Sequence, residues 1–221
     1  MENHLKISKT IRKCQRNWDL SKTIPEEHIQ HLAYIAKHAP SKQDEAYFDL
    51  VIIKSRNIID KIHEWSVGFS MFDDTGNPLP SLKNPQTAAN ILFLWFRKKP
   101  TTKRNFYQLR WNHDRKHGEP KDDLDPNRKD NAYISIGVSL GVTAWAAAEL
   151  GYVTGFSKNL GDHNNIKKLL HKLYNKHPKL EPTYSLGIGF PDVNLPHNVS
   201  HEGNEYPAFS KQERLTNIYE F

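Results

Sequence analysis

The N-terminal segment carries cations whose spacing suits the binding of a phosphate. Residues 1–24 hold six Lys or Arg against two Asp or Glu, a net charge of +4, and Arg12, Lys13 and Arg16 lie together within this segment. Guanidinium and ammonium groups are the usual protein partners of a phosphate dianion. Arg12 and Arg16 are four residues apart, so they would share one face of a helix. The pattern predicts either a phosphate site, on an anionic cofactor or a nucleic acid, or an ordinary solvated basic helix face.

A second basic segment spans residues 97–129. It holds 11 Lys or Arg and five Asp or Glu, and its net charge of +6 equals that of the whole chain. Its proline and glycine residues interrupt regular secondary structure and predict a loop; they are Pro100, Gly118, Pro120 and Pro126. It has no helix-turn-helix or aromatic RNA-binding signature. The simpler interpretation of this segment is a solvated insertion. The alternative is a surface that binds nucleic acid, with Phe106, Tyr107 and Trp111 interleaved among the charges.

Composition excludes several classes of protein. The single cysteine, Cys14, rules out an internal disulfide and a cysteine-based zinc site, and it fits a reducing compartment. The 12 histidines show no HExxH motif, so no metal site is expected. No apolar run reaches the roughly 18 residues of a membrane span, and the polar N-terminus has no signal-peptide core. We therefore expect a cytoplasmic protein that does not enter a membrane.

The elements that must position these residues alternate between helices and buried strands. Apolar periodicity predicts helices over 5–17, 25–38, 57–65, 131–150 and 162–175, with a short one possible at 211–219. Continuous apolar runs predict strands over 49–54, 90–96 and 183–190, and residues 68–80 have the composition of a loop. This order predicts an α+β fold with a small, mostly antiparallel sheet and helices on both faces. The helix over 131–150 is rich in small residues, which suits a central position and a dimer axis.

Several separated segments carry a family resemblance. The first is Arg12-Lys13-Cys14-Gln15-Arg16-Asn17-Trp18, and the second is Ala39-Pro40-Ser41-Lys42-Gln43-Asp44, which precedes a strand. The third is the small-residue helix that ends at Leu150-Gly151 and continues into Val153-Thr154-Gly155-Phe156. A later strand, Leu186-Gly187-Ile188-Gly189-Phe190, follows in the same order. In motif order and spacing the chain resembles the FMN-dependent nitroreductase family over most of residues 5–192.

The resemblance implies a nitroreductase-like fold and a set of flavin-binding residues. Arg12 and Lys13 would bind the FMN phosphate with Cys14 beside them, and Arg16 would approach the flavin ring, where a cation stabilises the reduced, anionic form. Pro40, Ser41, Lys42 and Asp44 would form a wall against the flavin and, in the dimer, against the ribityl chain. Gly155, Phe156 and Ser157 would present backbone N–H groups to the ring, with glycine allowing close approach.

The same segments depart from the family pattern at informative positions. Cys14 stands where serine is usual and is a weaker donor, and Asp44 stands where asparagine is usual. The stretch after residue 192 has no Lys or Arg until Lys211, where the family often supplies a basic pair.

The resemblance implies a homodimeric oxidoreductase with FMN at the interface. NADH or NADPH would pass a hydride to the flavin and leave, and a nitroaromatic, quinone or related small-molecule acceptor would then take the electrons in the same pocket, in a ping-pong sequence. Residues 1–192 would form one FMN-binding domain, with 193–221 as an extension that wraps the partner subunit. No side-chain general acid is evident, so no catalytic residue is named. Two alternatives stay open: a nucleic-acid-associated module that uses 97–129, and a specialised or non-catalytic flavin-binding protein of the same fold.

Overall fold

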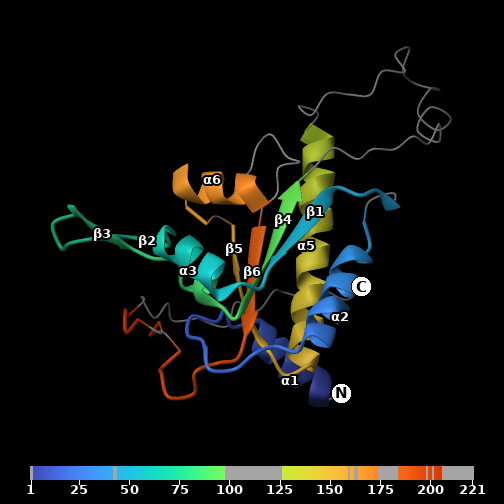
Figure 1. Cartoon of the computed structure of the whole chain (residues 1–221), viewed down its shortest axis with the longest axis horizontal. Helices are drawn as coiled ribbons and strands as arrows, with labels where there is room; N and C mark the ends of the chain where they lie inside the picture. The colour runs from blue at the N-terminus through green and yellow to red at the C-terminus, as the bar shows by residue number, and fades with distance from the viewer. Residues whose placement is uncertain are drawn as a thin grey trace, which may run out of the picture.

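The computed structural model describes residues 2–41, 44–97, 126–158, 160–161, 164–173, 184–197, 199–200 and 202–205. Helices and strands alternate along the chain (Figure 1) in the order α1 (Glu2–Ile11), α2 (Glu26–Lys37), β1 (Phe48–Ile53), α3 (Arg56–Glu64), β2 (Phe69–Phe72), β3 (Pro78–Leu82), the 3₁₀ helix η2 (Pro85–Ala88), β4 (Ile91–Arg97), α5 (Pro126–Glu149), β5 (Val153–Ser157), α6 (Asn164–Leu173) and β6 (Tyr184–Gly189). The predicted helix over 211–219 and almost all of the basic segment lie outside the described residues.

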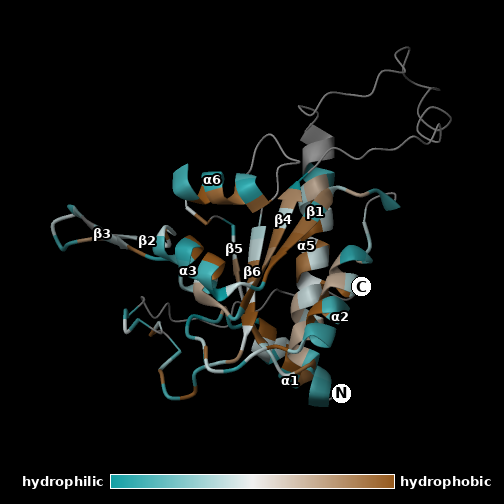
Figure 2. Ribbon diagram, viewed as in Figure 1, coloured by the Kyte–Doolittle hydropathy of each residue, from teal (hydrophilic) through white to brown (hydrophobic). Residues whose placement is uncertain are grey.

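The main sheet is antiparallel, with strand order β1-β4-β6-β5. β4, one of its two inner strands, is buried from Ile91 to Phe96, as its continuous apolar run predicts for a strand covered on both faces. Alternate β4 side chains enter different cores because successive side chains of a strand point to opposite faces. Ile91, Phe93 and Trp95 pack in one core cluster, and Leu92, Leu94 and Phe96 in the other. Figure 2 shows hydrophobic residues gathered on β1 and β4.

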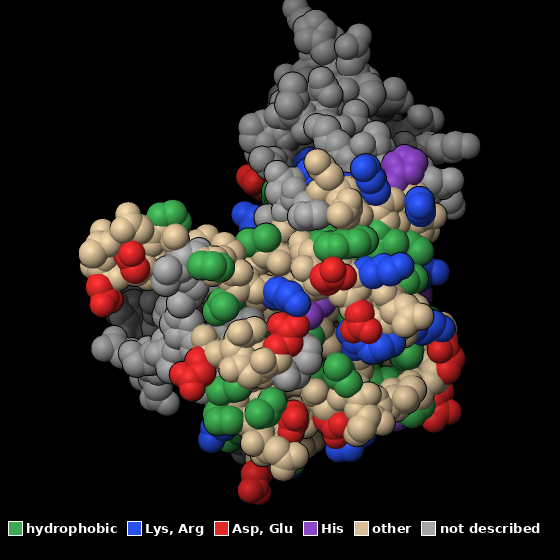
Figure 3. All heavy atoms as spheres, turned by 60° about the vertical axis from the view of Figure 1, so that its left-hand side comes forward, with side chains coloured by type: hydrophobic (Ala, Val, Ile, Leu, Met, Phe, Trp, Pro, Cys, Tyr) green, Lys and Arg blue, Asp and Glu red, His purple; other side chains and the backbone are tan. Residues whose placement is uncertain are grey.

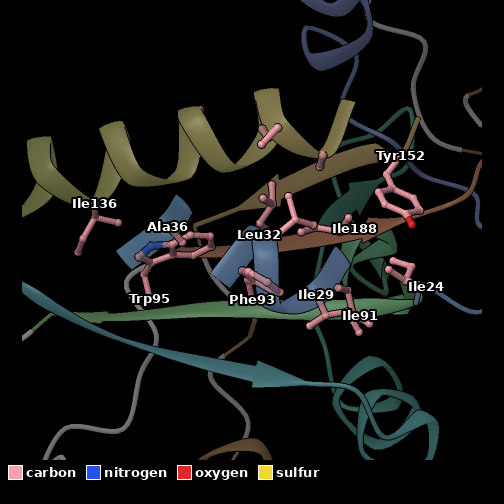
Figure 4. Close-up of a cluster of buried hydrophobic side chains, with 14 residues drawn as sticks. Ile24, Ile29, Leu32, Ala36, Ile91, Phe93, Trp95, Ile136, Tyr152 and Ile188 are labelled. Atoms are coloured by element: carbon pink, nitrogen blue, oxygen red, sulfur yellow. The ribbon is translucent and has the colours of Figure 1, made fainter. Parts of the chain in front are cut away.

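Helices cover both faces of the sheet, which confirms the predicted α+β class. On one face Leu32 and Ala36 of α2 and Ile136 of α5 meet Phe93 and Trp95, as Figure 4 shows. On the other face α3 and α6 supply apolar side chains, namely Ile59, Ile62, Ile166 and Leu170. Within the described ranges, none of the helices combines the length and the hydropathy that a membrane span requires.

Three local predictions were wrong. The first helix ends at Ile11 rather than near residue 17, because the backbone of Gln15 bonds to β5 instead of continuing the helical ladder. Residues 68–80, predicted as a loop, include most of the β2–β3 hairpin, whose turn is held by the Asp73 side chain accepting from the N–H groups of Thr75 and Asn77. The strand β5 was not among the predicted strands, and its pairing with β6 forms the fourth strand of the sheet.

Candidate functional site

The segment that follows α1 runs beside the free edge of β5. The Gln15 N–H donates to the Thr154 carbonyl at 2.9 Å, and the Cys14 thiol donates to the Phe156 carbonyl at 3.5 Å. These contacts join residues about 140 positions apart in the sequence. The first and third motifs of the sequence are therefore neighbours in the folded chain.

Gly155 makes this close approach possible. A Cβ atom on residue 155 would lie 2.7 Å from the Gln15 carbonyl oxygen and 2.8 Å from Cγ of Gln86, both far inside ordinary contact. The sequence suggested that glycine is needed for approach to a ligand. In the structure the glycine is needed for approach to the chain's own Gln15.

The extended backbone sorts the side chains of residues 14–17 into two sets. Gln15 and Asn17 are buried, whereas Cys14 and Arg16 are half-buried, as the alternation of an extended chain requires. Arg12 and Lys13 are exposed. The expectation that Arg12 and Arg16 share a helical face is therefore wrong, since α1 ends before both of them. Their cationic groups instead belong to one short segment alongside β5, where Phe156 is 56% exposed.

A buried polar network lies behind β5, and it was not predicted from the sequence. The Asn84 amide donates to the Ser157 hydroxyl at 2.7 Å, and the Asn84 side-chain oxygen accepts from the Gln86 N–H at 3.1 Å. The Trp18 indole donates to the Pro85 carbonyl at 2.8 Å. The Asn84-Pro85 pair was the available signal, because an asparagine before a proline commonly starts a turn.

The turn after α2 lies apart from these residues within one chain. Asp44 adopts a left-handed backbone, φ 56°, and its N–H donates to the Ser41 carbonyl at 3.3 Å. Asp and Asn are the non-glycine residues that tolerate this conformation best, which accounts for one of them at position 44. The turn leads into β1, at the opposite edge of the sheet from β5. Figure 1 shows α1 near the C-terminal end of α5 and the start of β1 well away from it, while Lys42 lies outside the described residues.

The exposed side of α5 carries apolar residues and glycines. Ile134 is 62% and Val138 is 37% exposed, and Gly137 and Gly141 on the same side have open space where a Cβ would stand. These four residues, which we call the α5 face, recur at helical spacing. Leu5 of the neighbouring α1 is also 62% exposed. Such a face is typical of a surface that another apolar surface covers.

The charges on one face of the described surface are mixed in sign. On the face drawn in Figure 3, acidic and basic side chains are interspersed. Asp19, the first carboxylate after Arg16, accepts from Ser21 and pairs with Lys22 at 2.9 Å, and these hydrogen bonds lower the pKa of Asp19. Among the described residues, no three side chains of His, Cys, Asp or Glu gather closely enough to hold a metal ion.

Comparisons with known proteins bear on the fold. No family model and no curated protein matches the chain. Solved structures do match: a BluB-like flavoprotein from Clostridium difficile has a TM-score of 0.60 at 20% identity and covers 99% of this chain and 100% of its own. A nitroreductase-like protein from Streptococcus mutans has a TM-score of 0.58 at 19% identity, with the same coverage. Nitroreductase A from Vibrio parahaemolyticus has a TM-score of 0.60 at 12% identity and covers 99% of this chain and 79% of its own.

These likenesses agree with the motifs read from the sequence. The matches extend over almost the whole chain, and many of them carry nitroreductase or flavoprotein names. At identities of 20% and below they establish the architecture rather than the activity. The chain has the fold of the nitroreductase-family flavoproteins.

Proposed function

We propose that the protein is an FMN-dependent oxidoreductase that takes electrons from NADH or NADPH and passes them to a small-molecule acceptor such as a nitroaromatic or a quinone. The observation that carries the proposal is the contact of residues 14 and 15 with β5. It brings a cationic segment beside Gly155, Phe156 and Ser157 in a fold shared with flavoproteins.

The donor chemistry of this segment fits FMN. Arg12 and Lys13 are exposed, so their charged groups are accessible to the phosphate. Arg16 lies in the same extended segment and would face the ring, where a cation favours the reduced form. The exposed aromatic ring of Phe156 offers an apolar surface beside these cations. When bound, FMN would supply the hydride-accepting and electron-donating chemistry.

We further propose a homodimer whose sites combine residues of both subunits. The α5 face offers an apolar surface next to α1. The turn that holds Pro40, Ser41 and Asp44 leads into β1, at the sheet edge opposite β5, so we propose that a second copy brings its own turn to the site. Lys42, which the resemblance assigns to the same wall, belongs to this turn by sequence.

The proposal is tested by the spectrum of the purified protein. We expect flavin absorption as purified or after reconstitution with FMN, and oxidation of NADH or NADPH when a nitroaromatic is added. Protein that stays colourless after reconstitution would overturn the proposal. Flavin-loaded protein without turnover would instead identify a flavin-binding protein of this fold that lacks the proposed activity.

Matched variants test the assignment of residues. Arg12→Ala should weaken FMN binding by about tenfold or more, because a charge-assisted contact to the phosphate is lost. Lys9→Ala removes an exposed cation of α1 that lies outside the motif, and it should leave FMN affinity unchanged. Equal affinities of the two variants would contradict the role of Arg12.

A further inference from the structure

His63 of α3 is a buried histidine with a different partner on each ring nitrogen. Its side chain is 7% exposed. Nδ1 lies 2.9 Å from the Thr87 hydroxyl and 3.1 Å from the Asn84 carbonyl oxygen. Nε2 lies 3.4 Å from a carboxylate oxygen of Glu202, in the segment that follows β6.

The contacts on Nδ1 decide which nitrogen carries the proton in the neutral ring. The Asn84 carbonyl can only accept a hydrogen bond. The Thr87 hydroxyl directs its own proton to that same carbonyl at 2.6 Å, so its oxygen is left to accept as well. Both neighbours therefore require Nδ1 to donate, and neutral His63 has its lone pair on Nε2.

That lone pair would face the Glu202 carboxylate, which is itself only an acceptor. The Lys83 ammonium lies 2.9 Å from the same Glu202 oxygen and favours the ionised carboxylate. A neutral His63 thus sets two acceptors against each other, whereas a protonated His63 places a positive charge 3.4 Å from the Glu202 carboxylate, at ion-pair distance although the geometry there does not form a hydrogen bond. The contact is favourable when the imidazole is charged.

We propose that His63 and Glu202 form a protonation-dependent latch that holds residues 199–200 and 202–205 on the body of the protein. Protonation of Nε2 closes the latch, and loss of that proton as the pH rises releases it. The latch goes beyond the proposed oxidoreductase function and does not require bound FMN.

The surroundings of His63 support a response to protonation of its ring. Within the described residues, the charged groups beside the imidazole include Glu202 and Lys83, whereas η2 and the residue before it contribute the neutral groups of Thr87 and Asn84. β4 and α6 pack apolar side chains against α3. On α3 itself, Arg56 pairs with Asp60 at 2.8 Å.

The latched segment also reaches the candidate site. The Asn17 amide donates to the carbonyls of Pro196 at 2.9 Å and Val199 at 3.2 Å. Asn17 directly follows Arg16, so Val199 of the latched segment, and Pro196 just before it, contact the extended segment that carries this arginine. Release of the latch would loosen the support of that extended segment.

Hydrogen exchange of the full-length, flavin-free protein tests the latch. Backbone bonds within the segment, such as Ser200 N–H to the Asn204 carbonyl, provide protected amides. After correction for the intrinsic effect of pH, we expect protection of residues 199–200 and 202–205 to fall by about threefold or more between pH 6 and pH 9, as the ion pair between His63 and Glu202 is lost. Glu202→Gln should abolish this pH dependence.

A matched variant and a direct view of the ring complete the test. Glu205→Gln makes the same change three residues away in the same segment and should behave as the wild type. Nitrogen-15 NMR of the histidines should show His63 protonated on Nδ1 in its neutral form and on both nitrogens at low pH. Equal pH dependence of protection in the wild type and Glu202→Gln, or a neutral ring protonated on Nε2, would overturn the latch. Because neither readout involves FMN, its failure is distinct from a failure of the flavin proposal.

Discussion

Replacement of Gly155 by alanine should dislodge the cationic segment from β5. The new Cβ would lie 2.7 Å from the Gln15 carbonyl oxygen, which must retreat by about 0.7 Å to reach ordinary contact at 3.4 Å. The second obstacle, Cγ of Gln86, belongs to a side chain whose amide donates to that same carbonyl at 3.4 Å. The two obstacles are therefore linked, because a shift of the Gln15 carbonyl oxygen also disturbs its hydrogen bond with the Gln86 amide.

The cost follows from overpacking a buried position. Inserting a methyl group without room typically costs about 1–3 kcal/mol. Alanine restricts the unfolded chain more than glycine does, which returns about 0.4–1 kcal/mol. The net loss in the free energy of unfolding should be about 1–2 kcal/mol, or about 2–8 °C in Tm for a chain of this length. FMN affinity should also fall, since Arg16 moves with Gln15.

Thermal and urea denaturation of the flavin-free protein measure this loss directly. Lys158→Ala is the control, because it removes an exposed side chain just past β5 and should change stability by less than about 0.5 kcal/mol. A Gly155→Ala protein as stable as the control, with unchanged FMN affinity, would refute the inference that Gly155 allows residues 12–16 to pack against β5.

Three further predictions concern other parts of the fold. Val138→Glu should convert a dimer into monomers by light scattering, whereas Val193→Glu, at a position 87% exposed, should not; a dimer in both would exclude the α5 face as the interface. Asp44→Asn should preserve stability, but Asp44→Val should cost about 1–2 kcal/mol in urea denaturation because of the left-handed backbone, and equal stabilities would contradict that turn. Hydrogen bonds from Thr75 and Asn77 lower the pKa of Asp73 from 3.8 to about 2, so this carboxylate stabilises the hairpin above pH 3.8 and loses that effect as the pH falls through 2; an NMR titration midpoint near 3.8 would disprove the turn geometry.

The strands that form the core were predictable because the apolar composition of each segment by itself indicates a buried strand. Residues 91–96 are continuously apolar, and a strand covered on both faces needs that pattern. The β2 and β5 strands were not predictable in this way. β5 contains a glycine and two hydroxyl residues, and its extended form comes from pairing with β6 rather than from its own sequence.

The candidate site was predicted in its residues more than in its geometry. The motifs identified Arg12, Arg16 and Gly155, and the structure brings the first and third motifs together. The helical arrangement of the two arginines was wrong, and the contacts of His63, Asn84 and Glu202 were not predicted. Each of these three acquires its role from a partner on another element, which local periodicity does not encode.

The sequence by itself determined the α+β class, the apolar centre of the sheet and the cationic segment near the N-terminus. These features depend on residue type and short-range spacing, because those two properties indicate directly which segments are buried and where charge gathers. Tertiary structure decided where α1 ends, which face of residues 12–16 is exposed and which polar groups lie behind β5. Those outcomes depend on backbone hydrogen bonds such as Gln15 to Thr154, whose partners become neighbours once the sheet has formed.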